Sequence, residues 1–179
     1  MNKSIIIALF FVGVLSFDAS AQKGNSTGEF GNTLNLGLGI GGYYGYYGNV
    51  GGSLPVFNIN YELDVAKDFT LAPFITFYSY RNNTYYYQET VIPVGCKGTY
   101  YFDRILNAGS KWDFYLAGSL GYSIVKTTWD NGYYRYSGYN DVNPLFLDLH
   151  VGTEFHLSNK IGLFLDISSG VSTIGIAFH

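Results

Sequence analysis

Charged residues and cysteine are both scarce in this chain of 179 residues. Asp, Glu, Lys and Arg together make up 13% of the chain, and the formal net charge is -3. The sequence has no run of basic residues of the kind that binds nucleic acid or an anionic membrane surface, so we expect no nucleic-acid partner. The one cysteine, Cys96, excludes an intrachain disulfide and any zinc or iron–sulfur site built from several cysteines.

Apolar residues (47%), aromatic residues (19%) and glycine (23 residues) are abundant instead. Disordered chains combine few aromatic residues with a high net charge, so this chain is expected to fold. Its length fits one domain with a core or one closed barrel. The composition indicates a β-protein that keeps part of its surface out of water.

The first 21 residues have the organisation of a signal peptide. Lys3 precedes the apolar run Ile5–Phe17, and Ala19-Ser20-Ala21 provides the small residues that signal peptidase recognises. The alternative, a transmembrane helix, needs about 17–25 apolar residues, which this run does not reach. We therefore expect cleavage before Gln22, with residues 22–179 forming one exported domain. No later run is long enough for a spanning helix, so a membrane location would require a β-barrel.

Eight stretches of the exported region alternate apolar and polar residues with the period of two that is typical of β-strands. In the clearest stretch, Leu147 and Leu149 alternate with Asp148 and His150. The third stretch is apolar on both faces and contains a proline, so its register stays open. The predicted strands are Leu34–Ile40, Phe57–Leu63, Phe69–Tyr80, Thr90–Phe102, Trp112–Lys126, Leu145–His156, Ile161–Ser168 and Val171–His179.

The predicted connections alternate in length. Those at Asp64–Asp68, Asp103–Lys111 and Ser158–Lys160 are short or modest, whereas three others are long or rich in aromatic residues: Tyr43–Ser53, Arg81–Tyr87 and Thr127–Asn143. An even number of strands with short turns at one rim and longer loops at the other is typical of transmembrane barrels. A tilted strand of about 11 residues rises about 27 Å, close to the thickness of their apolar band.

The alternation does not say which face is inside, since a soluble, lipocalin-like barrel would turn its apolar face toward a ligand. The polar faces carry mainly Gly, Ser, Thr and Asn, whereas a soluble exterior should be rich in Lys and Glu. The apolar faces are nearly uncharged and end in aromatic residues, as the interfacial belts of membrane barrels do. We therefore predict an all-β fold, an eight-stranded antiparallel transmembrane β-barrel with up-and-down topology. The predicted belt residues are Tyr61, Phe102, Trp112, Tyr122 and Phe155.

The signal peptide, the eight alternating strands, the Tyr/Gly-rich loops and the closing strand Val171–His179 together resemble the small outer-membrane β-barrel proteins of Gram-negative bacteria. The resemblance is to the OmpA/OmpX/OmpW-like group, particularly the versions common in Bacteroidetes. It implies a monomer in the outer membrane that contacts lipid and lipopolysaccharide. It also implies recognition of the last strand by the barrel-assembly machinery, for which Phe178 is penultimate here rather than terminal.

Several ionisable side chains are predicted to face the lumen. The group is Glu62, Lys97, Asp148, His150, Glu154, His156 and Asp166. Histidine and carboxylate are good ligands for zinc, so a metal site or a proton relay is one interpretation. The favoured interpretation is a plug in which these charges pair across strands, with the histidines offsetting the excess of carboxylates over Lys97, because unpaired buried charge is costly. No metal, cofactor or catalytic residue is therefore expected.

Two further features suggest chemistry but are better explained structurally. His156-Leu157-Ser158-Asn159 is similar to the His-x-Ser-Asn stretch of outer-membrane lipid A deacylases, in which His and Ser act as base and nucleophile. The downstream Glu that this chemistry requires is missing, and the stretch is predicted to be a turn. Cys96 falls on the apolar, lipid-facing register and is expected to be a small apolar residue there rather than a nucleophile.

Eleven of the 18 tyrosines fall in three predicted surface connections. Tyrosine among Gly, Ser and Asn suits adaptable recognition, so these loops could bind a host protein, a glycan or a phage; alternatively they rest among lipopolysaccharide headgroups. The expected function is structural or surface-binding rather than catalytic. The alternatives are a passive, OmpW-like channel for small apolar solutes, then a lipid-modifying enzyme or a soluble carrier. The loop tyrosines are Tyr43, Tyr44, Tyr46, Tyr47, Tyr85, Tyr86, Tyr87, Tyr133, Tyr134, Tyr136 and Tyr139.

Overall fold

The computed structural model describes residues 32–41, 55–83, 86–106, 109, 111–130 and 144–179. The predicted signal peptide lies outside these residues. The described part of the chain forms eight strands and one short helix. They are β1 Thr33–Gly41, β2 Val56–Ala66, β3 Phe69–Asn82, β4 Tyr87–Tyr101, α2 Asp103–Leu106, β5 Trp112–Trp129, β6 Leu145–Ser158, β7 Ile161–Ser168 and β8 Val171–Phe178.

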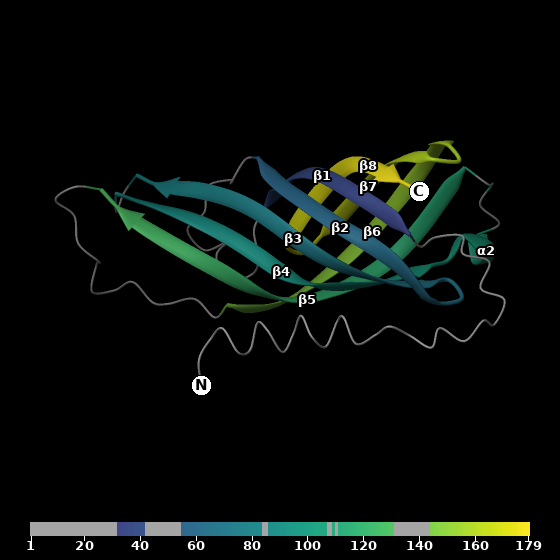
Figure 1. Cartoon of the computed structure of the whole chain (residues 1–179), viewed down its shortest axis with the longest axis horizontal. Helices are drawn as coiled ribbons and strands as arrows, with labels where there is room; N and C mark the ends of the chain where they lie inside the picture. The colour runs from purple at the N-terminus through teal and green to yellow at the C-terminus, as the bar shows by residue number, and fades with distance from the viewer. Residues whose placement is uncertain (1–31, 42–54, 84–85, 107–108, 110, 131–143) are drawn as a thin grey trace.

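Each strand pairs antiparallel with the next one in sequence, and β1 pairs with β8, so the sheet closes on itself (Figure 1). The closing pair aligns Leu36 with Ile176 and Leu38 with Ile174. Because side chains alternate along each strand, closure leaves one set inside the barrel and the other set outside. The predicted eight-stranded antiparallel meander is confirmed.

The connections alternate between the two rims as predicted. One rim, called here the short-turn rim, carries the connections at 67–68, 102–111 and 159–160. The first residues of β1 and the last residues of β8 lie at the same rim. The opposite rim, called the loop rim, carries those at 42–55, 83–86 and 130–144 and a tight turn at 169–170. At the short-turn rim Asp68 has a φ of 60°, a left-handed conformation that closes the two-residue turn between β2 and β3.

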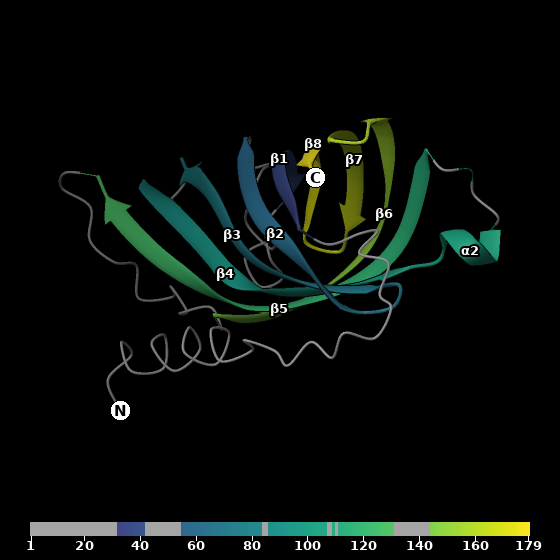
Figure 2. The same cartoon turned by 45° about the vertical axis from the view of Figure 1, so that its right-hand side comes forward.

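Strands β3, β4 and β5 reach further at the loop rim than the other strands do (Figure 2). β4 begins at Tyr87 rather than Thr90, and β5 ends at Trp129 rather than Lys126, because the pairing of Tyr87 with Trp129 prolongs the ladder. The expectation that Tyr87 belongs to a surface connection is wrong. Its side chain is buried against Trp129, with 5.0 Å between the ring centroids.

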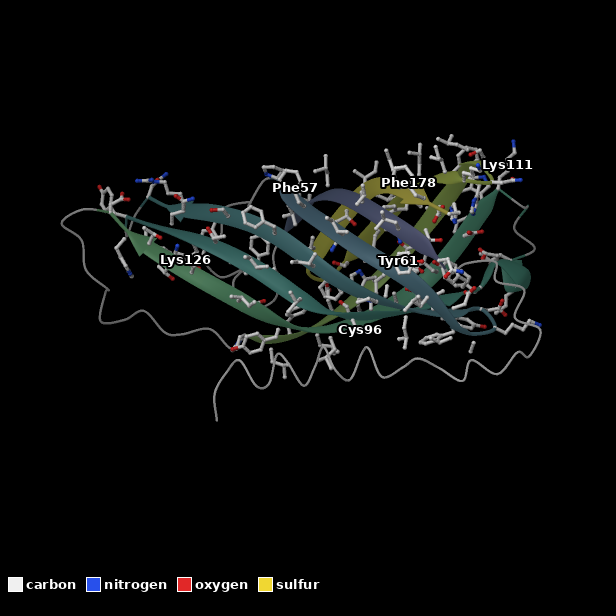
Figure 3. All side chains as sticks on the ribbon, in the orientation of Figure 1. Phe57, Tyr61, Cys96, Lys111, Lys126 and Phe178 are labelled. Atoms are coloured by element: carbon white, nitrogen blue, oxygen red, sulfur yellow. The ribbon has the colours of Figure 1, made fainter. Side chains whose placement is uncertain are left out.

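The outer face of the barrel is apolar. Leu147 and Leu149 are 67% and 64% exposed, and the same register on every strand carries exposed apolar residues. Within the described strands, the outward positions hold no acidic residue, and the charged ones, Arg81 and Lys126, lie near the loop-rim ends of β3 and β5. Lys126 and Lys111 lie at opposite ends of the barrel (Figure 3). The polar faces line the interior, so the lipocalin-like arrangement is excluded.

Aromatic rings on the outer face gather toward the two rims. Near the short-turn rim, Trp112 packs on Phe155 and Phe114, with ring centroids 4.7 and 6.1 Å apart. Of the other predicted belt residues, Tyr61 is exposed at the same rim and Tyr122 toward the loop rim, while Phe102 is half-buried beside Phe114. These rings suit the interfaces of a membrane, where an apolar ring with a polar edge is favoured.

Cys96 lies on the outward register of β4, as predicted. It pairs with Leu120 of β5 and Pro73 of β3 and is partly exposed (Figure 3). The third predicted strand, whose register was open, turns Phe74, Thr76 and Tyr78 inward.

Glycines on the inward register make room for large side chains. A Cβ atom at Gly152 of β6 would lie 2.1 Å from Cζ of Tyr115, so the Tyr115 ring rests directly on the β6 backbone. Gly37 and Gly175 accommodate Phe164 in the same way. The lumen is therefore filled by side chains that lean across neighbouring strands.

Candidate functional site

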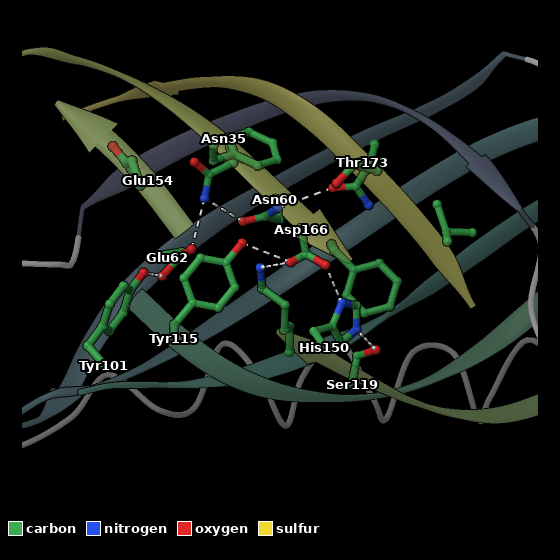
Figure 4. A pocket seen from close by; sticks show the side chains of 15 residues that line it. Asn35, Asn60, Glu62, Tyr101, Tyr115, Ser119, His150, Glu154, Asp166 and Thr173 are labelled. Carbon is green, nitrogen blue, oxygen red and sulfur yellow. Dashed lines mark hydrogen bonds and ion pairs between the residues drawn. The ribbon is translucent and has the colours of Figure 1, made fainter. Parts of the chain in front are cut away.

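Asp166 of β7 is the centre of a polar network inside the barrel (Figure 4). Its Oδ2 lies 3.4 Å from Nζ of Lys97 on β4 and accepts a hydrogen bond of 3.0 Å from the hydroxyl of Tyr115 on β5. Its Oδ1 lies 2.7 Å from Nδ1 of His150, which must donate because a carboxylate only accepts. Lys97 and Asp166 are both buried, so this pair is screened little by solvent.

His150 of β6 links Asp166 to a second carboxylate, that of Asp148, which is also on β6. Nε2 of His150 lies 2.9 Å from the Ser119 hydroxyl and 3.6 Å from Oδ2 of Asp148. Asp148 also accepts hydrogen bonds from the hydroxyls of Ser168 (3.0 Å) and Ser169 (2.5 Å) beside the β7–β8 turn. Neutral donors therefore share the stabilisation of Asp148 with His150.

Glu62 forms a second centre, nearer the short-turn rim. It accepts hydrogen bonds from the Asn35 amide (2.9 Å), the Thr70 hydroxyl (2.7 Å) and the Tyr101 hydroxyl (2.7 Å). Because these three donors lie on β1, β3 and β4 and Glu62 lies on β2, four neighbouring strands are linked around one carboxylate. The Asn35 amide also donates to Asn60 of β2. Charge-assisted hydrogen bonds of this kind are about twice as strong as neutral ones.

Glu154 and His156 lie apart from this network, at the short-turn rim. Nε2 of His156 lies 2.7 Å from Oδ2 of Asp113, and its ring stacks on that of His179, with 4.9 Å between centroids. Nε2 of His179 lies 2.8 Å from Oε1 of Glu154, and this hydrogen bond raises the pKa of His179. The predicted lumen residues thus separate into an inner group around Asp166 and Glu62 and a rim group.

The His-x-Ser-Asn stretch is a strand end and turn in the structure, as expected. The ladder between β6 and β7 shifts register between His156 and Ser158, and the Ser158 hydroxyl accepts a hydrogen bond from the Lys160 amide. The imidazole of His156 is directed to Asp113.

Sequence reasoning missed several buried or half-buried ionisable residues, among them Glu89, Asp113 and His179. Glu89 faces inward near the loop rim, where the hydroxyls of Tyr80 and Thr127 donate to it. Extending the alternation of the fourth stretch back by one period from Val91 would have placed Glu89 inside. Asp113 and His179 lie at strand ends, where alternation does not show which side chains meet.

An apolar cluster packs part of the interior toward the loop rim. Six buried side chains form one cluster there, with the rings of Phe74 and Phe146 separated by 6.2 Å. A cavity of about 30 Å³, room for about two water molecules, lies within the polar network and reaches Phe74 and Val171 of this cluster. This cavity has space for water rather than for a larger solute. The cluster comprises Val56, Phe74, Tyr78, Val91, Phe146 and Val171.

Most of the predicted loop tyrosines lie outside the described residues. These are Tyr43, Tyr44, Tyr46, Tyr47, Tyr85, Tyr133, Tyr134, Tyr136 and Tyr139. Tyr86 is described and is 43% exposed in the turn between β3 and β4, with a φ of 55°. It is thus the described part of the predicted recognition surface.

Helices do not provide a membrane span in the described part of the chain, where none is long and apolar enough to cross a bilayer. No protein-family model and no curated protein sequence matches the chain. Several solved structures are similar to this one. Neisserial surface protein A is 13% identical, with 82% of this chain and 94% of that one covered and a TM-score of 0.50. The chain has the fold of a transmembrane β-barrel.

Two further similar structures are also membrane barrels. The Yersinia pestis outer membrane protein Ail, solved in a phospholipid bilayer nanodisc, is 10% identical, with 82% of this chain and 98% of that one covered and a TM-score of 0.46. A de novo designed transmembrane β-barrel is 13% identical, with 83% and 95% covered and a TM-score of 0.43. At these identities the likeness concerns the fold alone.

Proposed function

We propose that this chain is exported by its signal peptide (residues 1–21) and resides as a monomer in the outer membrane of a Gram-negative cell. It would belong to the OmpA/OmpX/OmpW-like barrels, in the form common in Bacteroidetes. The apolar outer face supports this proposal, since a closed barrel with such a face is stable only in lipid. The outward-facing Phe178 on β8 supports recognition of that strand by the barrel-assembly machinery.

Within the membrane, the barrel would serve as a rigid scaffold that presents a binding surface at the loop rim. The single observation that carries this role is the prolonged β3–β5 sheet at that rim, which lifts the exposed Tyr86 above the other strands. The tyrosine-rich connections 42–55 and 130–144 join the same rim. The filled interior supports a scaffold over a passive channel, and the turn at Ser158 supports a non-catalytic role.

Loop variants of the full chain test this proposal. One variant changes Tyr43, Tyr44, Tyr46, Tyr47 and Tyr86 to Ser, and a matched control changes the same residues to Phe, which keeps the rings. We expect cells that display the wild type or the Phe control to bind glycans or host surface proteins on an array, and the Ser variant to lose that binding while remaining a folded barrel. Equal binding by all three would refute the recognition role. If the Ser variant binds as the wild type does and differs only in its melting temperature in vesicles that contain lipopolysaccharide, a contact with lipid headgroups is favoured instead.

A further inference from the structure

Three side chains at the short-turn rim offer ligand atoms to one common point. Glu154 and His156 come from the end of β6, and His179 follows β8, two strands away around the barrel. Oε1 of Glu154 lies 2.8 Å from Nε2 of His179 and 4.0 Å from Nδ1 of His156, and the ligand atoms of all three residues lie within 4.8 Å of one another. In a tetrahedral zinc site with bonds of about 2.0–2.1 Å, ligand atoms are about 3.3 Å apart. Adjustments of about an ångström would suffice.

Each imidazole already has a partner on its far side. Nε2 of His156 lies 2.7 Å from Asp113 and must donate to that carboxylate, so its Nδ1 carries the lone pair. Nδ1 of His179 lies 3.0 Å from the Thr33 hydroxyl, which can accept a hydrogen bond from Nδ1 when the metal replaces the proton that Nε2 donates to Glu154. Metal-binding histidines almost always donate their other ring nitrogen in this way, which fixes the tautomer and the ring orientation.

The backbone between the ligands is shaped to let Glu154 reach His179. Strand β7 separates β6 from β8, and Gly162 occupies the position where the Glu154 side chain crosses it. A Cβ atom at Gly162 would lie 1.8 Å from Oε1 of Glu154, so any other residue would displace the carboxylate. The side chains of Glu154, His156 and His179 are 8%, 21% and 17% exposed, so the point they share is shielded but open to the rim.

We propose that Glu154, His156 and His179 bind a divalent transition metal, with zinc as the best fit and a water molecule as the fourth ligand. Two imidazoles and one carboxylate match the preferences of Zn²⁺, whereas Mg²⁺ and Ca²⁺ prefer all-oxygen sites. The metal would link the end of β6 to the end of β8, next to the β1–β8 pair that closes the barrel. Because it binds only the folded protein, it would stabilise the barrel by mass action. This site goes beyond the proposed loop-rim function and does not depend on it.

Zinc and cobalt titrations of the untagged full chain, extracted in detergent and freed of metal by a chelator, test the site. We expect one equivalent of Zn²⁺ to bind, and one equivalent of Co²⁺ to give the intense visible bands of tetrahedral coordination. His156→Ala, His179→Ala and Glu154→Gln should each abolish those bands and weaken zinc binding by at least about tenfold. Asp113→Asn, which changes only the outer partner, should weaken it about 10–100-fold.

His150→Gln is the matched control, since His150 is the remaining histidine of the chain and lies in the inner network. It should leave both titrations unchanged, and the heat-dependent gel migration of each variant reports whether the barrel has folded. Absence of stoichiometric binding by the wild type would overturn the proposal. Binding retained in both His156→Ala and His179→Ala, or lost equally in folded His150→Gln, would also overturn it.

Discussion

Replacing Asp166 by alanine removes the carboxylate on which the inner network converges. The change leaves the buried Lys97 ammonium without the oxygen 3.4 Å away and deprives His150 and Tyr115 of their acceptor. Breaking a buried ion pair by removing one partner costs about 3–5 kcal/mol, because the remaining charge stays desolvated. We expect a loss of that size in the free energy of unfolding, measured by urea denaturation of the barrel in lipid vesicles.

A matched control exists on the surface of the same barrel. Asp130 pairs with Arg81 at 2.5 Å, but their side chains are 34% and 54% exposed. Asp130→Ala should therefore cost about 0–1 kcal/mol. Adding Lys97→Met to Asp166→Ala removes the orphaned charge and should recover part of the loss. If Asp166→Ala costs no more than Asp130→Ala, the interior is hydrated enough to screen the pair, and the description of a buried, little-screened ion pair is refuted.

Two other substitutions test the packing of the lumen and the assignment of the outer face. Gly152→Ala should destabilise the barrel by about 1–3 kcal/mol, because the new methyl group overlaps the Tyr115 ring; Gly118→Ala, whose new methyl group would have no neighbour closer than 3.9 Å, should change the same urea midpoint little. Leu116→Lys places a charge on the outer face between the aromatic belts and should cost about 2–4 kcal/mol in vesicles, with Leu116→Val as the control; an unchanged stability would contradict lipid contact at this position.

The strands and their faces could be predicted from the sequence because alternation is a local property. The period of two around Leu147 and Asp148 holds wherever the strand is placed, and closure then puts all polar faces on one side. The third stretch resisted prediction because Phe74 and Tyr78, which face inward, are as apolar as the outward Ile75 and Phe77. The local pattern does not distinguish an apolar side chain that faces lipid from one that packs inside the barrel.

The partners of each site residue could not be predicted, because they depend on the stagger between strands. The sequence placed His150 and His156 on one face of one strand, yet His150 meets Asp166 and His156 meets Asp113. His179 joins the rim group because the β6–β7 and β7–β8 ladders bring the end of β8 near the end of β6. The extension of β4 as far as Tyr87 likewise depends on its pairing with β5, in which Tyr87 lies opposite Trp129.

The central claim, a closed barrel whose apolar face contacts lipid, is tested most directly on the chain expressed with its own signal peptide. Cells are fractionated, and the detergent-extracted protein is run on a gel with and without boiling. We predict recovery in the outer-membrane fraction and a shift in migration on boiling, as the closed barrel unfolds. A protein released without detergent, with the same migration in both samples, would contradict the account.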